Sequence, residues 1–198
     1  MNRNFVVSAL LAFTAAGAFA QTTAASSLQR DVKQQQRIEQ GLQSGKLTTR
    51  EAALLERDES RVDRLQAQAL KDGQLTDAER SRLQQAQNQA SRDISTATYN
   101  GVNGNPLSAS SQRMQADVQR NVNQEQRIQQ GLKSGELTRH EAAKLERGQA
   151  KVDHKEYAAG RDGHVGQAEQ HRVQHAENHQ SKAIHQQKHD AQERPTKG

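Results

Sequence analysis

Apolar residues recur along the first half of this chain at spacings that place them on one face of a helix. Three such stripes can be followed: Leu28, Val32, Ile38 and Leu42; Leu55, Val62, Leu65 and Ala69; and Leu83, Ala86, Ala90, Ile94 and Ala97. The pattern therefore predicts three amphipathic helices in this half.

The same pattern returns 90 residues later, which indicates an internal duplication. The stretch QQRIEQGLQSGKLTTREAALLER at 35–57 aligns with EQRIQQGLKSGELTRHEAAKLER at 125–147, and 62–80 aligns more loosely with 152–170. Between the halves, NGVNGNPLSASS is rich in Asn, Gly and Ser, as linkers are. We expect an all-α fold of duplicated three-helix units, with a first unit at 21–99, a linker at 100–111 and a second unit at 112–191.

The second half carries substitutions that weaken its apolar stripes. Gly148, Lys155 and Gly160 stand where the first half has Asp58, Leu65 and Leu70. Because glycine is flexible within a helix and lysine is polar at an apolar position, these residues predict local fraying.

A glycine turn separates the predicted helices of each half. It reads SGKLTTRE at 44–51, DGQLTDAE at 72–79, SGELTRHE at 134–141 and DGHVGQAE at 162–169. Glycine suits the left-handed residue that ends a helix, and threonine followed three residues later by glutamate is a capping box that begins the next one. The fourth turn has Gly166 in place of threonine, so the helix that follows it should start more weakly.

These turns resemble the second half of an EF-hand loop, which needs oxygen ligands at positions 1, 3, 5 and 12 around a glycine at position 6. Three of the four turns have leucine at position 3, namely Leu42, Leu70 and Leu132. Leucine cannot bind a cation, so we interpret the frame as an EF-hand-like but non-calcium helix-turn-helix staple. A degenerate EF-hand remains the alternative, with a weak calcium site formed by Asp72 and Glu79, or by Asp162 and Glu169.

The N-terminal residues have the form of a secretory signal peptide. Arg3 precedes an apolar run from Phe5 to Ala18, and Ala18-Phe19-Ala20 fits the A-x-A cleavage pattern. We therefore expect a signal peptide at 1–20, a periplasmic or secreted product without a membrane span, and a disordered tail at 192–198. Large apolar residues make up roughly one in six of the remaining chain, which predicts narrow apolar seams and no thick core.

Charge and cysteine content exclude further classes. The chain has no cysteine, so it can form neither a disulfide nor a thiolate site. Its net charge of +5 comes from interspersed residues of both signs, which is typical of a solvated helical surface and gives no indication of nucleic-acid binding.

All eight histidines lie in the second half, and five of them fall on the last predicted helix. These five are His171, His175, His179, His185 and His189. They lie on the face opposite Val173, Ala176 and Ile184, and pairs four residues apart can present two imidazoles to one zinc, copper or nickel ion. The alternative is that they are polar residues on a solvated face.

Enzyme motifs are not found in the sequence. The stretch HEAAK at 140–144 has Lys144 where a zinc protease helix needs its second histidine. A chain so poor in large apolar residues is also badly suited to enclosing a dry pocket. We expect a protein that is not an enzyme.

The duplicated motifs GLxSGxLTxxEAAxLER and DGxLTxxE behind a signal sequence resemble uncharacterised exported helical-repeat proteins of beta-proteobacteria, across nearly the whole mature chain. Leu75-Thr76-x-x-Glu79-Arg80 also resembles the L-T-x-x-Q-R motif of periplasmic stress proteins, with glutamate in place of glutamine. This second resemblance implies a helical chaperone or a zinc-responsive accessory protein.

Two functional hypotheses follow. The first is a periplasmic helical-repeat binding protein that holds a transition metal weakly through the five histidines in envelope stress. The second is a structural or chaperone-like module whose amphipathic helices pair with a second copy or with client envelope proteins.

Overall fold

The computed structural model describes residues 16–72 and 75–190, and over these residues the protein is all-α. Its helices are α1 (Ala16–Gln43), α2 (Thr49–Leu70), α3 (Asp77–Tyr99), α4 (Ala109–Ser134), α5 (Arg139–Gly160) and α6 (Gln167–His189). The predicted all-α class is thus confirmed. Helices α5 and α6 begin 90 residues after α2 and α3, the same shift that separates the repeated sequences.

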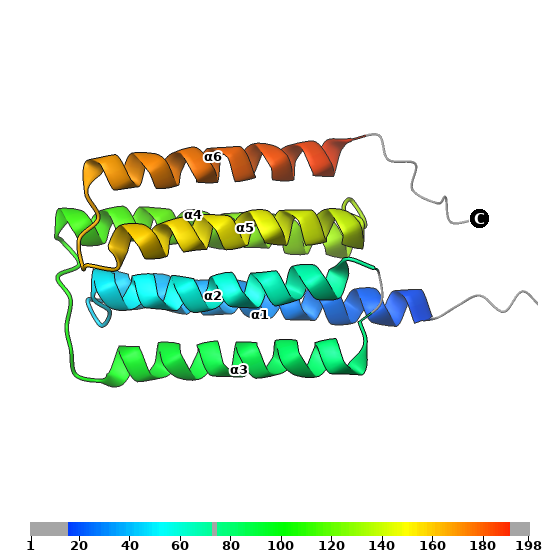
Figure 1. Cartoon of the computed structure of the whole chain (residues 1–198), viewed down its shortest axis with the longest axis horizontal. Coiled ribbons are helices and arrows are strands. Elements are labelled where there is room, and N and C mark those ends of the chain that lie inside the picture. Colours follow the sequence, from blue (N-terminus) through cyan, green and yellow to red (C-terminus); the bar gives the residue numbers. More distant parts are fainter. Residues whose placement is uncertain (1–15, 73–74, 191–198) are drawn as a thin grey trace, which may run out of the picture.

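Four helices form the centre of the molecule, and the other two flank it. Helix α2 packs most extensively on α5, and α1 packs on α4, so the main contacts join the first half of the chain to the second. Helix α3 lies on the outer side of α1 and α2, while α6 lies on the opposite side against α4 and α5 (Figure 1). The sequence did not reveal this interlocked packing of the halves.

The core has an apolar cluster at each end and a polar layer between them. One cluster includes Ile38, Leu42, Met114 and Val118, and the other includes Leu28, Leu70, Ile128, Leu132 and Leu145. On each central helix the residues between the two clusters include several buried acids and amides, such as Asp31, Gln34 and Gln35 on α1, beside buried valines. The expectation of narrow seams without a thick core was therefore wrong, because polar side chains supply much of the buried volume.

The turns have the capping geometry that the sequence predicts. Gly45, Gly135 and Gly163 have φ of 71°, 77° and 91°, the left-handed conformation that favours glycine. Thr48, Thr76 and Thr138 each accept a hydrogen bond from the third helical N–H, and the glutamate there accepts the N–H of the threonine. Before α6, Glu169 accepts the N–H of Gly166, but no side chain caps the helix.

The predicted fraying in the second half was wrong. Helix α5 runs without interruption through Gly148 and Lys155 and ends at Gly160. A Cβ atom at Gly148 would collide with the side-chain oxygen of Gln180 on α6. The glycine therefore leaves room for the buried end of the Gln180 side chain against α5 and is not a point of weakness.

Residues 1–15 of the predicted signal peptide and the predicted tail at 192–198 lie outside the described residues. Among the described residues, no helix combines the length and apolarity needed to cross a membrane.

We expect Thr138→Ala to lower the free energy of unfolding by about 1 kcal/mol, because the hydroxyl satisfies an otherwise unpaired N–H at the start of a core helix. Urea denaturation measures this loss. The control Thr96→Ala removes an exposed hydroxyl within α3 and should change stability by less than about 0.5 kcal/mol. Equal effects of the two substitutions would contradict the capping role.

Candidate metal centre

Eight carboxylates lie in the polar layer between the four central helices. They are Asp31 on α1, Glu56, Glu59 and Asp63 on α2, Glu125 on α4, and Glu146, Asp153 and Glu156 on α5. None is more than 2% exposed to solvent, and the buried residues of the described chain include no lysine or arginine. Burial of unpaired carboxylates is costly unless they are neutralised by protons or by cations.

Helix periodicity brings these acids to the inside. Glu56, Glu59 and Asp63 are three and four residues apart, so they share one face of α2. That face lies beside the apolar row of Leu55 and Val62, which is also buried. Because α2 is packed between other helices, a face wider than a single apolar stripe is buried.

Three of the acids form a first triad, Asp31, Asp63 and Glu146, which come from α1, α2 and α5. One oxygen from each lies within 4.8 Å of the other two. A hard cation such as Ca²⁺ is bound by oxygens 2.3–2.6 Å away, so oxygens at this separation can share one ion.

Two further acids surround the first triad and reinforce its negative charge. The charge of Asp31 raises the pKa of Glu59 and of Glu125, after burial itself. Both oxygens of Glu59, Glu125 and Glu146 have no hydrogen-bond partner among the described residues. A buried acceptor without a partner is unfavourable, so this part of the core has unused capacity for a proton or a cation.

A second triad consists of Glu56, Asp153 and Glu156, again with one oxygen from each within 4.8 Å of the others. Here side-chain amides supply hydrogen bonds. Gln35 Nε2 donates to Glu56 at 2.9 Å, Asn121 Nδ2 donates to Glu156 at 2.7 Å, and Gln149 Nε2 donates to Asp153 at 3.2 Å.

The repeat explains why the two triads differ. Asp31 of the first triad and its two neighbours Glu59 and Glu125 have amides at the matching positions of the other half: Asn121, Gln149 and Gln35. Amides carry no charge and can donate hydrogen bonds. In the first triad Asp31 accepts a hydrogen bond from Gln87 Nε2 at 2.6 Å, but Glu146 and the neighbouring Glu59 and Glu125 have no partner for either oxygen among the described residues. In the second triad each acid accepts an amide hydrogen bond.

All eight acids have raised pKa values. Burial raises the pKa of Asp31 and Asp153 to about 7 and that of Glu56 to about 8. Burial, followed by the charges of neighbouring carboxylates, raises the pKa of the other five well above the usual value. After burial itself, the charge of Asp153 raises the pKa of Asp63, so the two triads influence each other.

The five predicted histidine ligands are exposed along α6, as their helical positions indicated. His185 and His189 stack with ring centroids 4.2 Å apart, and His189 Nδ1 donates to the carbonyl oxygen of His185. His175 and His179 line a groove between α6 and α5. In the described part of the chain, no group of three clustered ligand residues includes a histidine.

Among the residues that the structure describes, the turn acids do not form a clustered ligand group either. Glu79 accepts two hydrogen bonds from Thr76, Glu169 caps Gly166, and Asp162 accepts the N–H of His164. Neither triad includes a turn residue. The predicted staple role accounts for these glutamates.

Comparisons of the chain with protein-family models, with curated proteins and with solved structures find no match.

In the absence of metal we expect stability to fall as pH rises from about 4 to about 8. The folded state binds more protons than the unfolded chain over this range, because the folded pKa values of these acids are raised. Thermal unfolding in a chelating buffer should therefore give the highest Tm near the acidic end.

A variant with three amide substitutions, Asp31→Asn, Glu59→Gln and Glu125→Gln, tests the cause. Each new residue is the one found at the matching position of the repeat, so the core should accept it. This amide variant should show a smaller fall in Tm, while Asp77→Asn on the exposed start of α3 should not change the fall. A Tm that rises with pH would contradict the assignment.

Proposed function

We propose that the protein binds hard metal cations, such as Ca²⁺ or Mn²⁺, between the four central helices. The observation that supports this most directly is the first triad with its two neighbouring acids, where buried carboxylate oxygens lack partners. Oxygen-only ligand sets favour calcium, magnesium and manganese over zinc, copper and nickel. Magnesium is the weaker candidate among these, because it keeps several waters and the acids are at most 2% exposed to solvent.

The unequal surroundings of the two triads imply unequal affinities. The first triad and its two neighbours bring five carboxylates together, and most of their oxygens lack a hydrogen-bond partner among the described residues. The second triad has three, and one oxygen of each already accepts an amide hydrogen bond, so the first group should attract a cation more strongly. The first triad would therefore be filled first. Binding would release protons, because the acids must ionise to act as ligands.

We propose a binding role in preference to catalysis. The acids are at most 2% exposed, so a substrate larger than an ion cannot reach them without opening of the bundle. Ion entry would then accompany folding or local opening of the helices. The signal-like N-terminus supports action in the periplasm or outside the cell, and a role in envelope stress fits that location.

The chaperone-like alternative has less support. In the described part of the chain, the exposed large hydrophobic side chains are Tyr99, Val102 and Leu107, all in or next to the connection between α3 and α4. Client binding generally uses a broader apolar surface.

We expect Ca²⁺ or Mn²⁺, added during refolding at pH 7.5, to remain bound through desalting and to raise Tm. An ion at 100 times its Kd adds about 2.7 kcal/mol, or roughly 5–10 °C for a chain of this size. Elemental analysis and calorimetry measure the stoichiometry and the affinity. The amide variant should bind at least tenfold more weakly.

Two controls separate the candidate ligand sets. Replacing the five α6 histidines with glutamine should leave Ca²⁺ and Mn²⁺ binding unchanged. The reciprocal variant Gln35→Glu, Asn121→Asp and Gln149→Glu should create a second tight site at the second triad. If the amide variant binds Ca²⁺ or Mn²⁺ as tightly as the wild type, the proposal is wrong. If zinc binding is lost only in the histidine variant, the α6 histidines are the metal ligands instead.

A further inference from the structure

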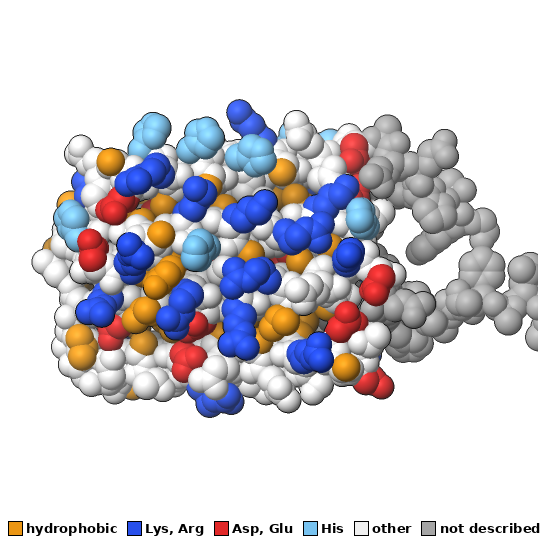
Figure 2. Space-filling model, viewed as in Figure 1, with side chains coloured by type: hydrophobic (Ala, Val, Ile, Leu, Met, Phe, Trp, Pro, Cys, Tyr) orange, Lys and Arg blue, Asp and Glu red, His pale blue; other side chains and the backbone are white. Residues whose placement is uncertain are grey.

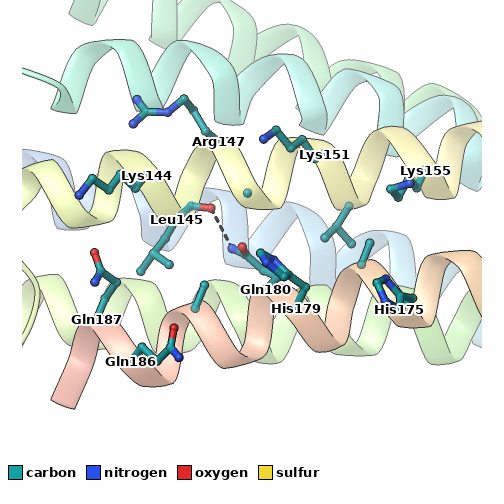
Figure 3. A pocket seen from close by; sticks show the side chains of 14 residues that line it. Lys144, Leu145, Arg147, Lys151, Lys155, His175, His179, Gln180, Gln186 and Gln187 are labelled. Atoms are coloured by element: carbon teal, nitrogen blue, oxygen red, sulfur yellow. Dashed lines mark hydrogen bonds between the residues drawn. The ribbon is translucent and has the colours of Figure 1, made fainter. Parts of the chain in front are cut away.

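A basic groove runs between α5 and α6 on the face that carries the histidines. It has a volume of about 710 Å³, and its lining includes Lys144, Arg147, Lys151 and Lys155 from α5 and His175 and His179 from α6. Figure 3 shows the cationic side chains along α5 and the two imidazoles on the facing helix. None of the lining residues is an aspartate or glutamate.

The basic row on α5 also borders a second groove. Arg147, Lys151 and Lys155 line a hollow of about 540 Å³ against α2, where Arg64 and Lys71 face them. This groove also lacks an acidic lining residue. Figure 2 shows the Lys and Arg side chains gathered across this face of the molecule.

The four α5 cations are available for a ligand. Lys144, Arg147, Lys151 and Lys155 are all exposed, and none forms an ion pair with a carboxylate in the described chain. The residue that matches Arg147 in the first half behaves differently, since Arg57 pairs with Asp58 at 3.0 Å. Unpaired cations in a row produce a positive potential that attracts anions.

The first half of the repeat serves as an internal comparison. Leu54 and Leu65 match Lys144 and Lys155, while Asp58 and Asp93 match Gly148 and Ala183. Gln85 and Gln89 match His175 and His179. Compared with the first half, the second half has lysine in place of leucine and histidine in place of glutamine, and it lacks both aspartates. The positive charge of this groove is therefore specific to the second half.

The floor of the groove is compatible with a bound anion. Gln180 Nε2 donates to the carbonyl oxygen of Leu145 at 2.8 Å, in the space that the missing side chain of Gly148 leaves (Figure 3). An aspartate there, as in the first half, would place a negative charge beside the lysines. From Lys144 to Lys155 the row extends for about 16 Å along the helix, which is longer than one phosphate group can span.

We propose that the α5–α6 groove binds a linear anion made of several linked phosphate groups. Lysines placed along one helix contact successive phosphates, and the facing imidazoles contribute hydrogen-bond donors. The site is separate from the carboxylate layer, and it has the opposite charge.

Calorimetry with inorganic tripolyphosphate, in a low-salt buffer without divalent cations, tests the proposal. We expect saturable binding to the wild-type protein, and binding of orthophosphate at least tenfold weaker. Lys144→Leu with Lys155→Leu, which introduces the residues of the matching positions, should weaken tripolyphosphate binding at least tenfold. Ala183→Asp, which restores the matching acid, should weaken it without removing a lysine.

A matched control separates the groove from overall charge. Lys33→Gln with Arg82→Gln removes two exposed cations from α1 and α3 and should change the Kd by less than twofold. No binding by the wild type, equal affinity for orthophosphate, or an equal loss in the control would overturn the proposal. Circular dichroism verifies that each variant remains helical.

Discussion

The structure depends on one constraint: eight carboxylates are buried in a layer that contains no buried lysine or arginine from the described part of the chain. An ionised acid in a dry interior is unfavourable by several kcal/mol unless a proton, a hydrogen-bond donor or a cation compensates it. The protein supplies donors for some oxygens, through Gln35, Asn121 and Gln149, but not for those of Glu59, Glu125 and Glu146. The remaining acids are neutral only when protonated, so the stability of the fold depends on pH; the cation binding that we propose would neutralise them in another way.

The apolar clusters at the two ends hold this layer in place. Leucines, isoleucines and methionine pack on both sides of the acids along the bundle axis. The capping boxes fix the residues at which α2, α3 and α5 begin. Because the ends are well packed, the acids cannot turn outward to water without separating the helices. The same rigidity keeps the oxygens of each triad close enough to share an ion.

Local signals in the sequence predicted the helices and their turns, since Thr48 and Glu51 or Thr138 and Glu141 act within a few residues of each other. The carboxylate layer depends on which helices meet, and that information is not local. A search for apolar stripes alone assigns Glu56, Glu59 and Asp63 to a solvent-exposed face of the helix. Their recurrence beside Leu55 and Val62, and again as Glu146 and Asp153 beside Leu145 and Val152, was the available signal. The concentration of histidines on one helix predicted a metal site there, but in the structure these side chains lie on the exposed face of α6 and belong to neither triad.

Pairing of α2 with α5 and of α1 with α4 means that neither half of the chain covers its own polar face. A single half would need a second copy to complete the bundle, and in such a homodimer both triads would be identical by symmetry. A single polypeptide has no such restriction, so a mutation can change one triad and leave the other unchanged. The residues at 31 and 121 differ in this way: the chain has an acid at one position and an amide at the matching one.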